Sequence, residues 1–308
     1  MKLTGIADEA GNPVEVQIRA HQELGWDSIE MRNVEVIGVA KGNLHEIPQD
    51  AFDQVVAKLD EAGMGICGFG SVIGNWAHKI TDDFQVTLDE VNRAIPRLQR
   101  LNTGLIRIMS YALLEDGKEN DLPDQMKEER FRRLRVITKL FLDAGVTPVH
   151  ENCMNYGGMS PLHALELLEN VPGLKWVFDT GNPVFAADRS KPRPYPRQDA
   201  WEFYQAVKPH IAHVHVKDGT WNDDKQDCDY LMPGEGDGQV ERIISDLAGE
   251  GYDGYISIEP HVAVVFHDAD VGSDRDPEEL AREQYDSYVA YGKRMQEIVD
   301  RATAATPS

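Results

Sequence analysis

The sequence contains few cysteines and no long hydrophobic run, and these two deficits exclude several classes of protein. Its 308 residues include three cysteines, Cys67, Cys153 and Cys228. Their spacing does not fit a CxxC metal site, and their odd number does not fit a disulfide framework. Such sparse thiols indicate a reducing compartment. No apolar run approaches the roughly 20 residues that cross a bilayer, which argues against a membrane protein.

The chain also has few basic residues relative to acidic ones. It has 31 Lys and Arg against 53 Asp and Glu, which gives a formal net charge of −22. A surface of this charge repels phosphate backbones, so we do not expect nucleic acid as a partner. Met1 and Lys2 lead directly into the strand-like LTGIA, which leaves no room for the apolar region of a signal peptide. We therefore expect a cytoplasmic protein.

Short apolar segments alternate with helical patterns along the whole sequence. The helical segments repeat apolar residues at a period of 3.6, as in Phe131, Leu134, Ile137 and Phe141. Eight such repeats predict a single α/β domain, a (β/α)8 TIM barrel over 1–308. An open doubly wound sheet is the second alternative. It fits the sequence less well, because no glycine-rich phosphate-binding turn follows the first strand. The predicted strands are Lys2–Ala7, Ser28–Met31, Gly65–Phe69, Leu105–Met109, Thr147–Glu151, Lys175–Asp179, Ala212–Val216 and Tyr255–Glu259.

Residues at the predicted helix ends agree with this alternation. Asn12, Ser160 and Asp276 each precede a proline, which is the pattern of an N-cap followed by proline at the first helical position. Asp199 with Glu202 matches a variant of the capping box. The glycines predicted to end helices in the left-handed conformation are Gly25, Gly63, Gly145 and Gly251.

Four acidic or imidazole residues stand where the last four predicted strands end: Glu151, Asp179, His215 and Glu259. A carboxylate at the end of a buried strand is costly unless its charge is compensated. The carboxyl ends of barrel strands meet at one mouth, where active sites lie. Three carboxylates and one imidazole are suitable ligands for a hard divalent cation. The sequence therefore predicts a site for Mn²⁺, or for Mg²⁺ or Co²⁺.

Other polar residues near the predicted strand ends are candidates for substrate binding. Glu9 and Glu30 follow the first two strands, and they either contact substrate hydroxyls or pair with the neighbouring Arg32. Arg107 lies at the end of the fourth strand, where packing is the alternative role. His213 lies deeper in its strand than the histidine of the metal set, and we interpret it as a core-layer residue.

The segments after the sixth, seventh and eighth predicted strands are long. The first, DRSKPRPYPRQ, is basic and rich in proline, and it is either a stiff lid or a solvated excursion. The second carries Trp221 and PGEGDG, which does not match a phosphate-binding loop. The third, PHVAVVFHDAD, has five consecutive apolar residues, and we expect it to cover a ligand or a partner subunit. A C-terminal helix is expected beyond it.

Four motifs surround the metal set: HEN at Glu151, FDTGNP at Asp179, HVHVKD at His215 and SIEPH at Glu259. Together with GIADEAG near the N-terminus, they resemble the xylose-isomerase-like TIM-barrel sugar isomerase/epimerase superfamily over nearly the whole chain. The resemblance places the family's metal ligands on these same four residues. FDTGNPVF, PYPRQDAWEFY, HVHVKDG and PGEGDG also resemble the branch that includes the alpha-type subunits of C-glycoside deglycosidases, which act with a smaller beta subunit.

One position departs from the pattern of the family's ketose 3-epimerases. Those enzymes carry a histidine three residues after the metal-binding aspartate, and here the residue is Asn182. This departure argues against a free ketose as the substrate. The missing histidine, with the lack of histidines after the third and fourth strands, also argues against the related trinuclear-zinc apurinic endonucleases.

The resemblance implies an enzyme that deprotonates the carbon next to a metal-bound sugar carbonyl, through an enediolate. Glu151 is the first candidate for the base, with Glu259 across the ring. Return of the proton would give isomerisation or epimerisation. Departure of a group from the β carbon, with Lys217 or His261 as the proton donor, would instead make the protein a lyase that releases an aglycone from a 3-keto-glycoside.

A third alternative is a non-catalytic, metal-stabilised scaffold that binds sugar. In each case the expected ligand is a sugar or glycoside, and either a homo-oligomer or a smaller beta subunit stays open as the protein partner. The candidate substrate-binding residues are Glu30, Arg107, Asn182 and Trp221, the last of which would suit a bulky aryl group.

Overall fold

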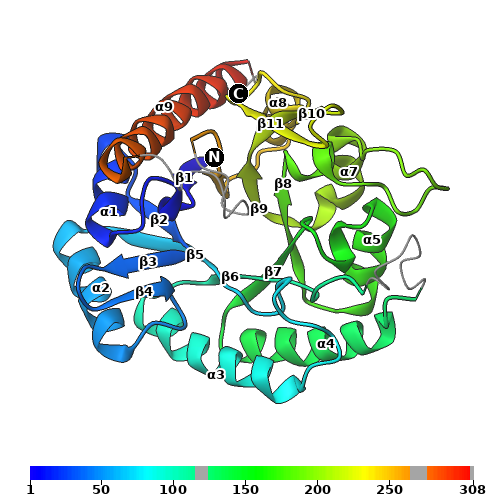
Figure 1. The fold of residues 1–308 in the computed structure, drawn as a ribbon, viewed down its shortest axis with the longest axis horizontal. Coiled ribbons are helices and arrows are strands. Elements are labelled where there is room, and N and C mark those ends of the chain that lie inside the picture. The colour runs from blue at the N-terminus through cyan, green and yellow to red at the C-terminus, as the bar shows by residue number, and fades with distance from the viewer. Residues whose placement is uncertain (115–123, 264–275, 306–308) are drawn as a thin grey trace.

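The computed structural model describes residues 1–114, 124–263 and 276–305. Eight parallel strands form one sheet that curves into a nearly closed ring, with helices around its outside (Figure 1). A bridge between Ile6 and Glu30 brings the two ends of the sheet together. The predicted (β/α)8 TIM barrel is therefore confirmed. In their order around the ring, the strands are β1 (Lys2–Gly5), β12 (Tyr255–Ile258), β9 (Ile211–Val216), β8 (Lys175–Asp179), β7 (Thr147–Glu151), β6 (Leu105–Ile108), β5 (Gly65–Gly70) and β2 (Ser28–Met31).

The outer helices bury one face each against the sheet. In α4 (Lys127–Asp143), the four residues of the predicted apolar stripe, from Phe131 to Phe141, are all buried. No helix in the described part of the chain is both long and apolar enough to cross a bilayer. The other outer helices are α1 (Val14–Glu23), α2 (Gln49–Ala62), α3 (Phe84–Arg100), α5 (Pro161–Asn170), α7 (Ala200–Val207), α8 (Val240–Gly249) and α9 (Pro277–Ala304).

Most of the predicted helix ends are confirmed. The side chains of Ser160, Asp199 and Asp276 accept hydrogen bonds from backbone N–H groups in the first turns of α5, α7 and α9. The prediction for Asn12 is wrong, because α1 begins at Val14 and no side chain caps it. Each glycine predicted to be left-handed has a φ between 63° and 78°, which permits a sharp exit from the helix: Gly25, Gly63, Gly145 and Gly251.

Two antiparallel hairpins were not predicted. One pairs β3 (Asn33–Val36) with β4 (Ala40–Asn43), and the other pairs β10 (Asp218–Asn222) with β11 (Asp227–Leu231). Both contain Asn, Gly or Asp at several positions, residue types that are depleted in strands. Their formation reflects contacts with the barrel that the local sequence does not reveal.

The PGEGDG segment after the second hairpin wraps around a buried carboxylate. The side chain of Asp218 accepts hydrogen bonds from the N–H groups of Gly219, Gly234, Gly236 and Gly238, at 2.8–3.1 Å. A Cβ added to Gly236 would overlap the carboxylate of Asp218. The glycine run therefore has a structural cause here, because it lets the backbone close around the carboxylate of Asp218.

Substitution of Gly5 tests how closely α9 packs against the barrel. An added Cβ would overlap the hydroxyl of Tyr288 in α9 and approach Ile258 Cγ1 to 2.7 Å, and both side chains are buried. We expect Gly5→Ala to lower the free energy of unfolding by about 1–3 kcal/mol in urea titrations, as overpacking does. Gly249→Ala is the control, because an added Cβ at this helical position meets nothing within 4 Å. An equal, small effect of both substitutions would contradict this packing.

Candidate active site

The four predicted metal ligands converge at the carboxyl ends of neighbouring strands. Glu151 and Asp179 are the last residues of β7 and β8, His215 is in β9, and Glu259 directly follows β12. One potential ligand atom from each residue lies within 4.8 Å of the others, and all four side chains are buried. Because adjacent parallel strands end at the same mouth, residues up to 108 positions apart in the sequence form one cluster.

Glu151 is held by two polar neighbours. Arg107 Nη1 donates to its Oε2 at 2.8 Å, and Asn182 Nδ2 donates to its Oε1 at 3.0 Å. Burial raises the pKa of this carboxyl, but the charges of Arg107 and His215 outweigh burial and lower the pKa to about 2. Glu151 is therefore ionised at neutral pH. Two of the four predicted substrate-binding residues, Arg107 and Asn182, therefore contact this carboxylate.

The two oxygens of Asp179 have different surroundings. Oδ1 accepts hydrogen bonds from the backbone N–H groups of Gly181 and Asn182, at 2.8 and 2.7 Å. Oδ2 is buried and makes no hydrogen bond, although the ammonium of Lys217 lies 3.4 Å away. Burial outweighs this attraction and raises the pKa of Asp179 to about 7. The carboxylate is thus oriented by one oxygen, while the other faces the cluster.

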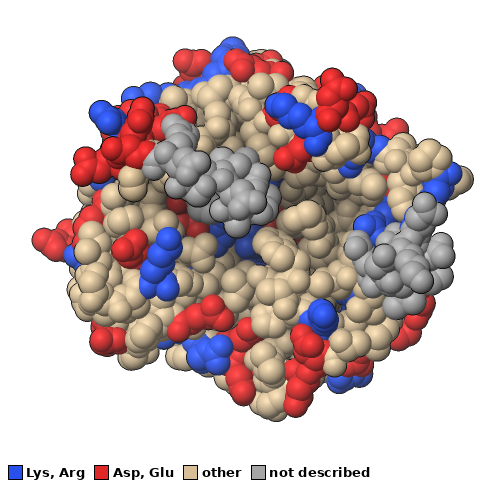
Figure 2. Space-filling view, in the orientation of Figure 1, with Lys and Arg blue, Asp and Glu red and all other residues tan. Residues whose placement is uncertain are grey.

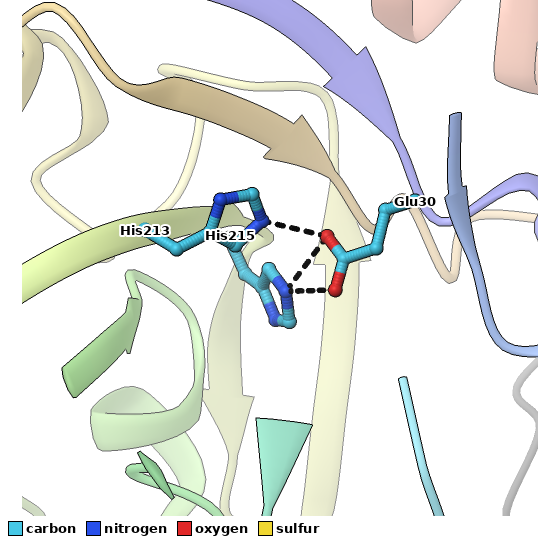
Figure 3. A group of neighbouring side chains, drawn as sticks. All are labelled: Glu30, His213 and His215. Carbon is cyan, nitrogen blue, oxygen red and sulfur yellow. Dashed lines mark hydrogen bonds and ion pairs between the residues drawn. The ribbon is translucent and has the colours of Figure 1, made fainter. Parts of the chain in front are cut away.

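His215 is oriented by a carboxylate from the opposite part of the chain (Figure 3). Its Nε2 donates to Glu30 of β2, with oxygens at 2.9 and 3.1 Å, and His213 Nε2 donates to the same carboxylate at 2.7 Å. An ionised carboxylate only accepts, so the His215 proton on this side is fixed at Nε2. Nδ1 is buried without a hydrogen bond and lies 3.6 Å from Glu151 Oε1. Such a pairing presents the second ring nitrogen as a metal ligand.

The structure does not support the prediction that Glu30 contacts substrate. Its carboxylate is fully buried, and both of its oxygens accept from histidines. His213 is buried within the barrel, as the interpretation as a core-layer residue requires. Burial by itself lowers the pKa of His215, but the charges of Glu30 and Glu151 outweigh it and raise the pKa to about 10.

Arg32 forms ion pairs with three carboxylates on the other side of the cluster. Its guanidinium lies 3.0 Å from Asp8, 3.2 Å from Glu9 and 2.9 Å from Glu259. The predicted pairing of Glu9 with Arg32 is therefore present. Asp8 was not predicted as a member of the site. It directly follows the predicted first strand, Lys2–Ala7, and this position was the available signal.

His261 belongs to this group through Glu9. Its backbone N–H donates to Glu9 Oε2 at 2.9 Å, and its Nδ1 lies 2.7 Å from Glu9 Oε1. The ring also contacts that of Tyr230, with centroids 5.2 Å apart. The aspartates of the following segment and most of its apolar run lie outside the described residues. The expectation that this run covers a ligand or partner therefore stays a prediction.

A cavity of about 210 Å³ opens above the cluster. The face shown in Figure 2 is hollowed near its middle, and both acidic and basic groups lie toward its outer edge. Trp221 is not among the described residues that line this cavity, so its predicted contact with substrate is not supported; its ring stacks instead under the guanidinium of Arg197, 3.3 Å from the ring centroid. The polar lining residues are Arg32, Asn33, Asn75, Arg107, Glu151, Asn182, Lys217 and Glu259, and the aromatic ones are Trp76, Phe185 and Tyr230.

The donor set fits a hard divalent cation. Asp179 Oδ2 and His215 Nδ1 are buried polar atoms without hydrogen bonds, and both face the carboxylates of Glu151 and Glu259. A buried polar atom without a partner is costly, and an ion at this position would satisfy both. In the structure, the ammonium of Lys217 lies 3.0 Å from Glu259 Oε2 and compensates part of the negative charge.

Comparisons with known proteins agree with this fold. No curated protein matches the sequence. A xylose isomerase-like TIM barrel protein from Mycobacterium smegmatis, solved in complex with magnesium, has 18% identity and a TM-score of 0.65 over 100% of this chain and 97% of that one. The IolI protein with a bound zinc atom has 14% identity and a TM-score of 0.69, over 98% and 99% of the two chains. The 3-keto-D-glucoside 4-epimerase from E. coli has 16% identity and a TM-score of 0.62, over 97% and 99%.

At these low identities the structural likeness concerns the fold. The family itself is shown by the sequence. The profile of the xylose isomerase-like TIM barrel family matches residues 18–290, which is most of the chain. The chain therefore belongs to the xylose isomerase-like TIM barrel family.

Proposed function

We propose that the protein is a divalent-metal-dependent sugar isomerase or epimerase that removes a proton from the carbon next to a sugar carbonyl. The observation that carries this proposal is the convergence of Glu151, Asp179, His215 and Glu259 beside a cavity that two of them, Glu151 and Glu259, line. Two buried atoms of the cluster that could bind a metal, one from Asp179 and one from His215, lack hydrogen bonds. The magnesium and the zinc bound by two structurally similar proteins support a metal at this site. Mn²⁺, Mg²⁺ and Co²⁺ all suit its ligands.

A bound dication would supply Lewis acidity, which makes the C–H bond next to a carbonyl more acidic. Glu151 and Glu259 both line the cavity and provide the bases. Burial raises the pKa of Glu259, but the charges of Lys217, His261 and Arg32 outweigh burial and lower it well below the usual range. Both carboxylates are therefore ionised and able to accept a proton at neutral pH. If one removes the proton and the other returns it on the opposite face, the carbon is epimerised.

The second candidate function is a lyase that releases the aglycone of a 3-keto-glycoside. The position of Lys217 favours this candidate, because a proton donor is needed for a leaving aglycone. The ammonium of Lys217 lines the cavity, whereas His261 is not among its described lining residues. After Glu151 accepts the α proton, the bond from the β carbon to the aglycone breaks, and the aglycone leaves with the electron pair. Lys217 would then donate the proton to the aglycone. The structural likeness to a 3-keto-D-glucoside 4-epimerase supports a keto-glycoside as the substrate class.

Deuterium incorporation tests this proposal and separates the alternatives. The protein is incubated with Mn²⁺ in D₂O, with ketoses, methyl 3-keto-glucoside and phenyl 3-keto-glucoside. Deuterium at the α carbon without fragmentation indicates an isomerase or epimerase, while release of phenol indicates the lyase. Co-purification of a smaller second subunit would further support the lyase. If no substrate exchanges deuterium, while metal binding still raises the melting temperature, the proposal is overturned in favour of a non-catalytic scaffold.

The affinity for metal is expected to depend strongly on pH. The pKa of His215 is about 10, so a proton must leave the imidazole before a cation can occupy Nδ1 at neutral pH. Below that pKa, each unit of pH should tighten binding about tenfold, which is about 100-fold between pH 7 and pH 9. Titration calorimetry with Mg²⁺ measures this slope. Glu30→Gln removes the carboxylate that raises the pKa and should flatten the slope; an affinity independent of pH in the parent protein would contradict the assignment of His215.

A further inference from the structure

A cavity of about 450 Å³ lies on the outside of the barrel between α2 and α3, which follow one another around the ring (Figure 1). Three arginines of α3 line it, Arg93, Arg97 and Arg100, and their spacing of four and three residues places them on one face of the helix. We call this cavity the arginine groove. Among its described lining residues the only acidic one is Asp53 of α2, which accepts a hydrogen bond from Gln49 at 2.9 Å. In a chain with a net charge of −22, such a local excess of positive charge is unusual.

The guanidinium at the centre of the groove has uncharged hydrogen-bond partners. Arg97 is 8% exposed, and its two terminal nitrogens donate to the carbonyl oxygens of Leu44 and Ile47 at 2.7 and 2.6 Å. The guanidinium also lies over the ring of Phe52, 4.8 Å from its centroid. Burial of a charge is costly unless an opposite charge compensates it. An anion bound in the groove would supply that compensation.

The pKa values of two buried side chains reflect this excess of positive charge. Burial, followed by the charges of Arg93 and Arg97, lowers the pKa of His45 to about 3. Burial and then the charge of Arg93 also lower the pKa of Arg97, and the opposite charge of Asp53 only partly offsets them. The acidic side chain of the groove therefore does not neutralise its arginines.

The two outer arginines of the groove are exposed and available to a ligand. Arg93 makes no hydrogen bond or ion pair with any residue that the structure describes. Arg100 lies 3.6 Å from Asp60, and both side chains are more than half exposed, so this pair contributes little to stability. A ligand could therefore bind both guanidinium groups without breaking a strong interaction. Guanidinium groups donate paired hydrogen bonds that match the oxygens of a phosphoryl group.

The groove also contains acceptors for hydroxyl groups. Pro96 lies inside α3 and has no N–H, so the carbonyl oxygen of Asn92 lacks its usual helical hydrogen bond. Pro96, Asn92 and Asp53 all line the groove, and the amide of Asn92 and the carboxylate of Asp53 add further acceptors. The volume of the groove is within the range of roughly 300–1,000 Å³ that is typical of ligand pockets. These groups suit a ligand that carries hydroxyl groups beside an anionic group.

We propose that the arginine groove binds a small phosphorylated molecule with hydroxyl groups, such as a sugar phosphate. The phosphoryl group lies among the three guanidinium groups, and the hydroxyl groups donate to Asp53 and to the carbonyl oxygen of Asn92. This site is separate from the metal cluster, because the described residues that line the groove and those that line the cavity beside the cluster do not overlap. The inference therefore does not depend on the proposed function.

Calorimetry with three probes tests the inference. Glucose 6-phosphate, inorganic phosphate and glucose are titrated into the metal-free protein at low ionic strength. We expect glucose 6-phosphate to bind most tightly, inorganic phosphate more weakly, and glucose not at all at the same concentrations. Arg93→Gln and Arg100→Gln should each weaken the binding of glucose 6-phosphate about fivefold or more, because each removes charge-assisted hydrogen bonds to the phosphoryl group. Arg135→Gln is the matched control, since Arg135 is exposed on α4, donates to the carbonyl oxygen of Asn170 and lies outside the groove.

Several results would overturn the inference. One is the absence of binding by either phosphorylated probe, and another is glucose 6-phosphate binding no more tightly than inorganic phosphate or glucose. An affinity that Arg93→Gln and Arg100→Gln leave unchanged would place the anion elsewhere, for example beside the cations of the other cavity. An equal loss of affinity in Arg135→Gln would show that overall charge, rather than the groove, determines binding. Because all three substituted arginines are exposed, the variants should keep the melting temperature of the parent protein, so a loss of binding reports on the site itself.

Discussion

Replacement of Glu151 by glutamine is expected to reduce the rate of α-carbon deuterium exchange by about 10³-fold or more. The amide cannot accept a proton, and a positioned general base contributes about 10²–10⁴-fold to a rate. The substitution also removes one carboxylate ligand from the cluster, which adds to the loss. Mass spectrometry of substrates incubated in D₂O, at saturating Mn²⁺, measures the effect directly.

The matched control is the same substitution at a carboxylate outside the site. Glu166 pairs with Lys127 at 2.6 Å on the outer surface and is about one-third exposed, so Glu166→Gln should leave the exchange rate within about twofold. Retention of turnover in Glu151→Gln, together with a lower melting temperature when metal is removed, would instead identify a scaffold stabilised by its ion. That outcome would disprove the assignment of Glu151 as the base.

Replacement of Lys217 by methionine is expected to change stability and metal affinity in opposite directions. Lys217 is 3% exposed, and its ammonium pairs with Asp179 and Glu259. Loss of one partner of a buried charge pair costs about 3–5 kcal/mol, so the metal-free variant should unfold at a lower urea concentration. In the variant, Mn²⁺ no longer has to break the ion pairs of Lys217 with Asp179 and Glu259, two of the predicted metal ligands. We therefore expect Mn²⁺ to bind at least about tenfold more tightly.

Urea unfolding in EDTA and calorimetry with Mn²⁺ measure these two effects separately. Lys139→Met is the control, because Lys139 pairs with Asp143 on an exposed helical face, where such a pair contributes about 0.3–0.5 kcal/mol. Unchanged stability and unchanged affinity in Lys217→Met would show that the ammonium does not compensate the cluster. In that case another cation must neutralise Asp179 and Glu259 when the site is empty of metal.

The barrel and the four converging residues could be predicted from the sequence because both depend on local patterns. Buried parallel strands are short apolar runs, and Glu151, Asp179 and Glu259 interrupt such runs at their ends. The strand bounds differ from those predicted by no more than two residues at either end. The cap predicted at Asn12 failed because Asn-Pro is also a common turn, and only the backbone decides between the two.

The surroundings of the cluster could not be predicted in the same way. Glu30 and His215 are 185 residues apart, and the sequence around neither residue indicates that His215 donates a hydrogen bond to Glu30. The two roles predicted for Glu30 were contact with substrate and pairing with Arg32, and both would place its carboxylate at the mouth of the barrel. The carboxylate instead accepts hydrogen bonds from two histidines inside the ring. The hairpin β10–β11 escaped prediction because its Asp, Gly and Asn residues are stabilised by tertiary contacts, including those of the buried Asp218.

The carboxylate that orients His215 lies on β2, while all four candidate ligands come from β7 and later parts of the chain. A fragment that begins at β7 would contain the complete donor set but would lack the group that fixes its imidazole. The imidazole therefore cannot be fixed in its orientation before β2 and β9 have come together. We therefore expect assembly of the reactive centre during folding to depend on contact between the N-terminal strands and the second half of the barrel.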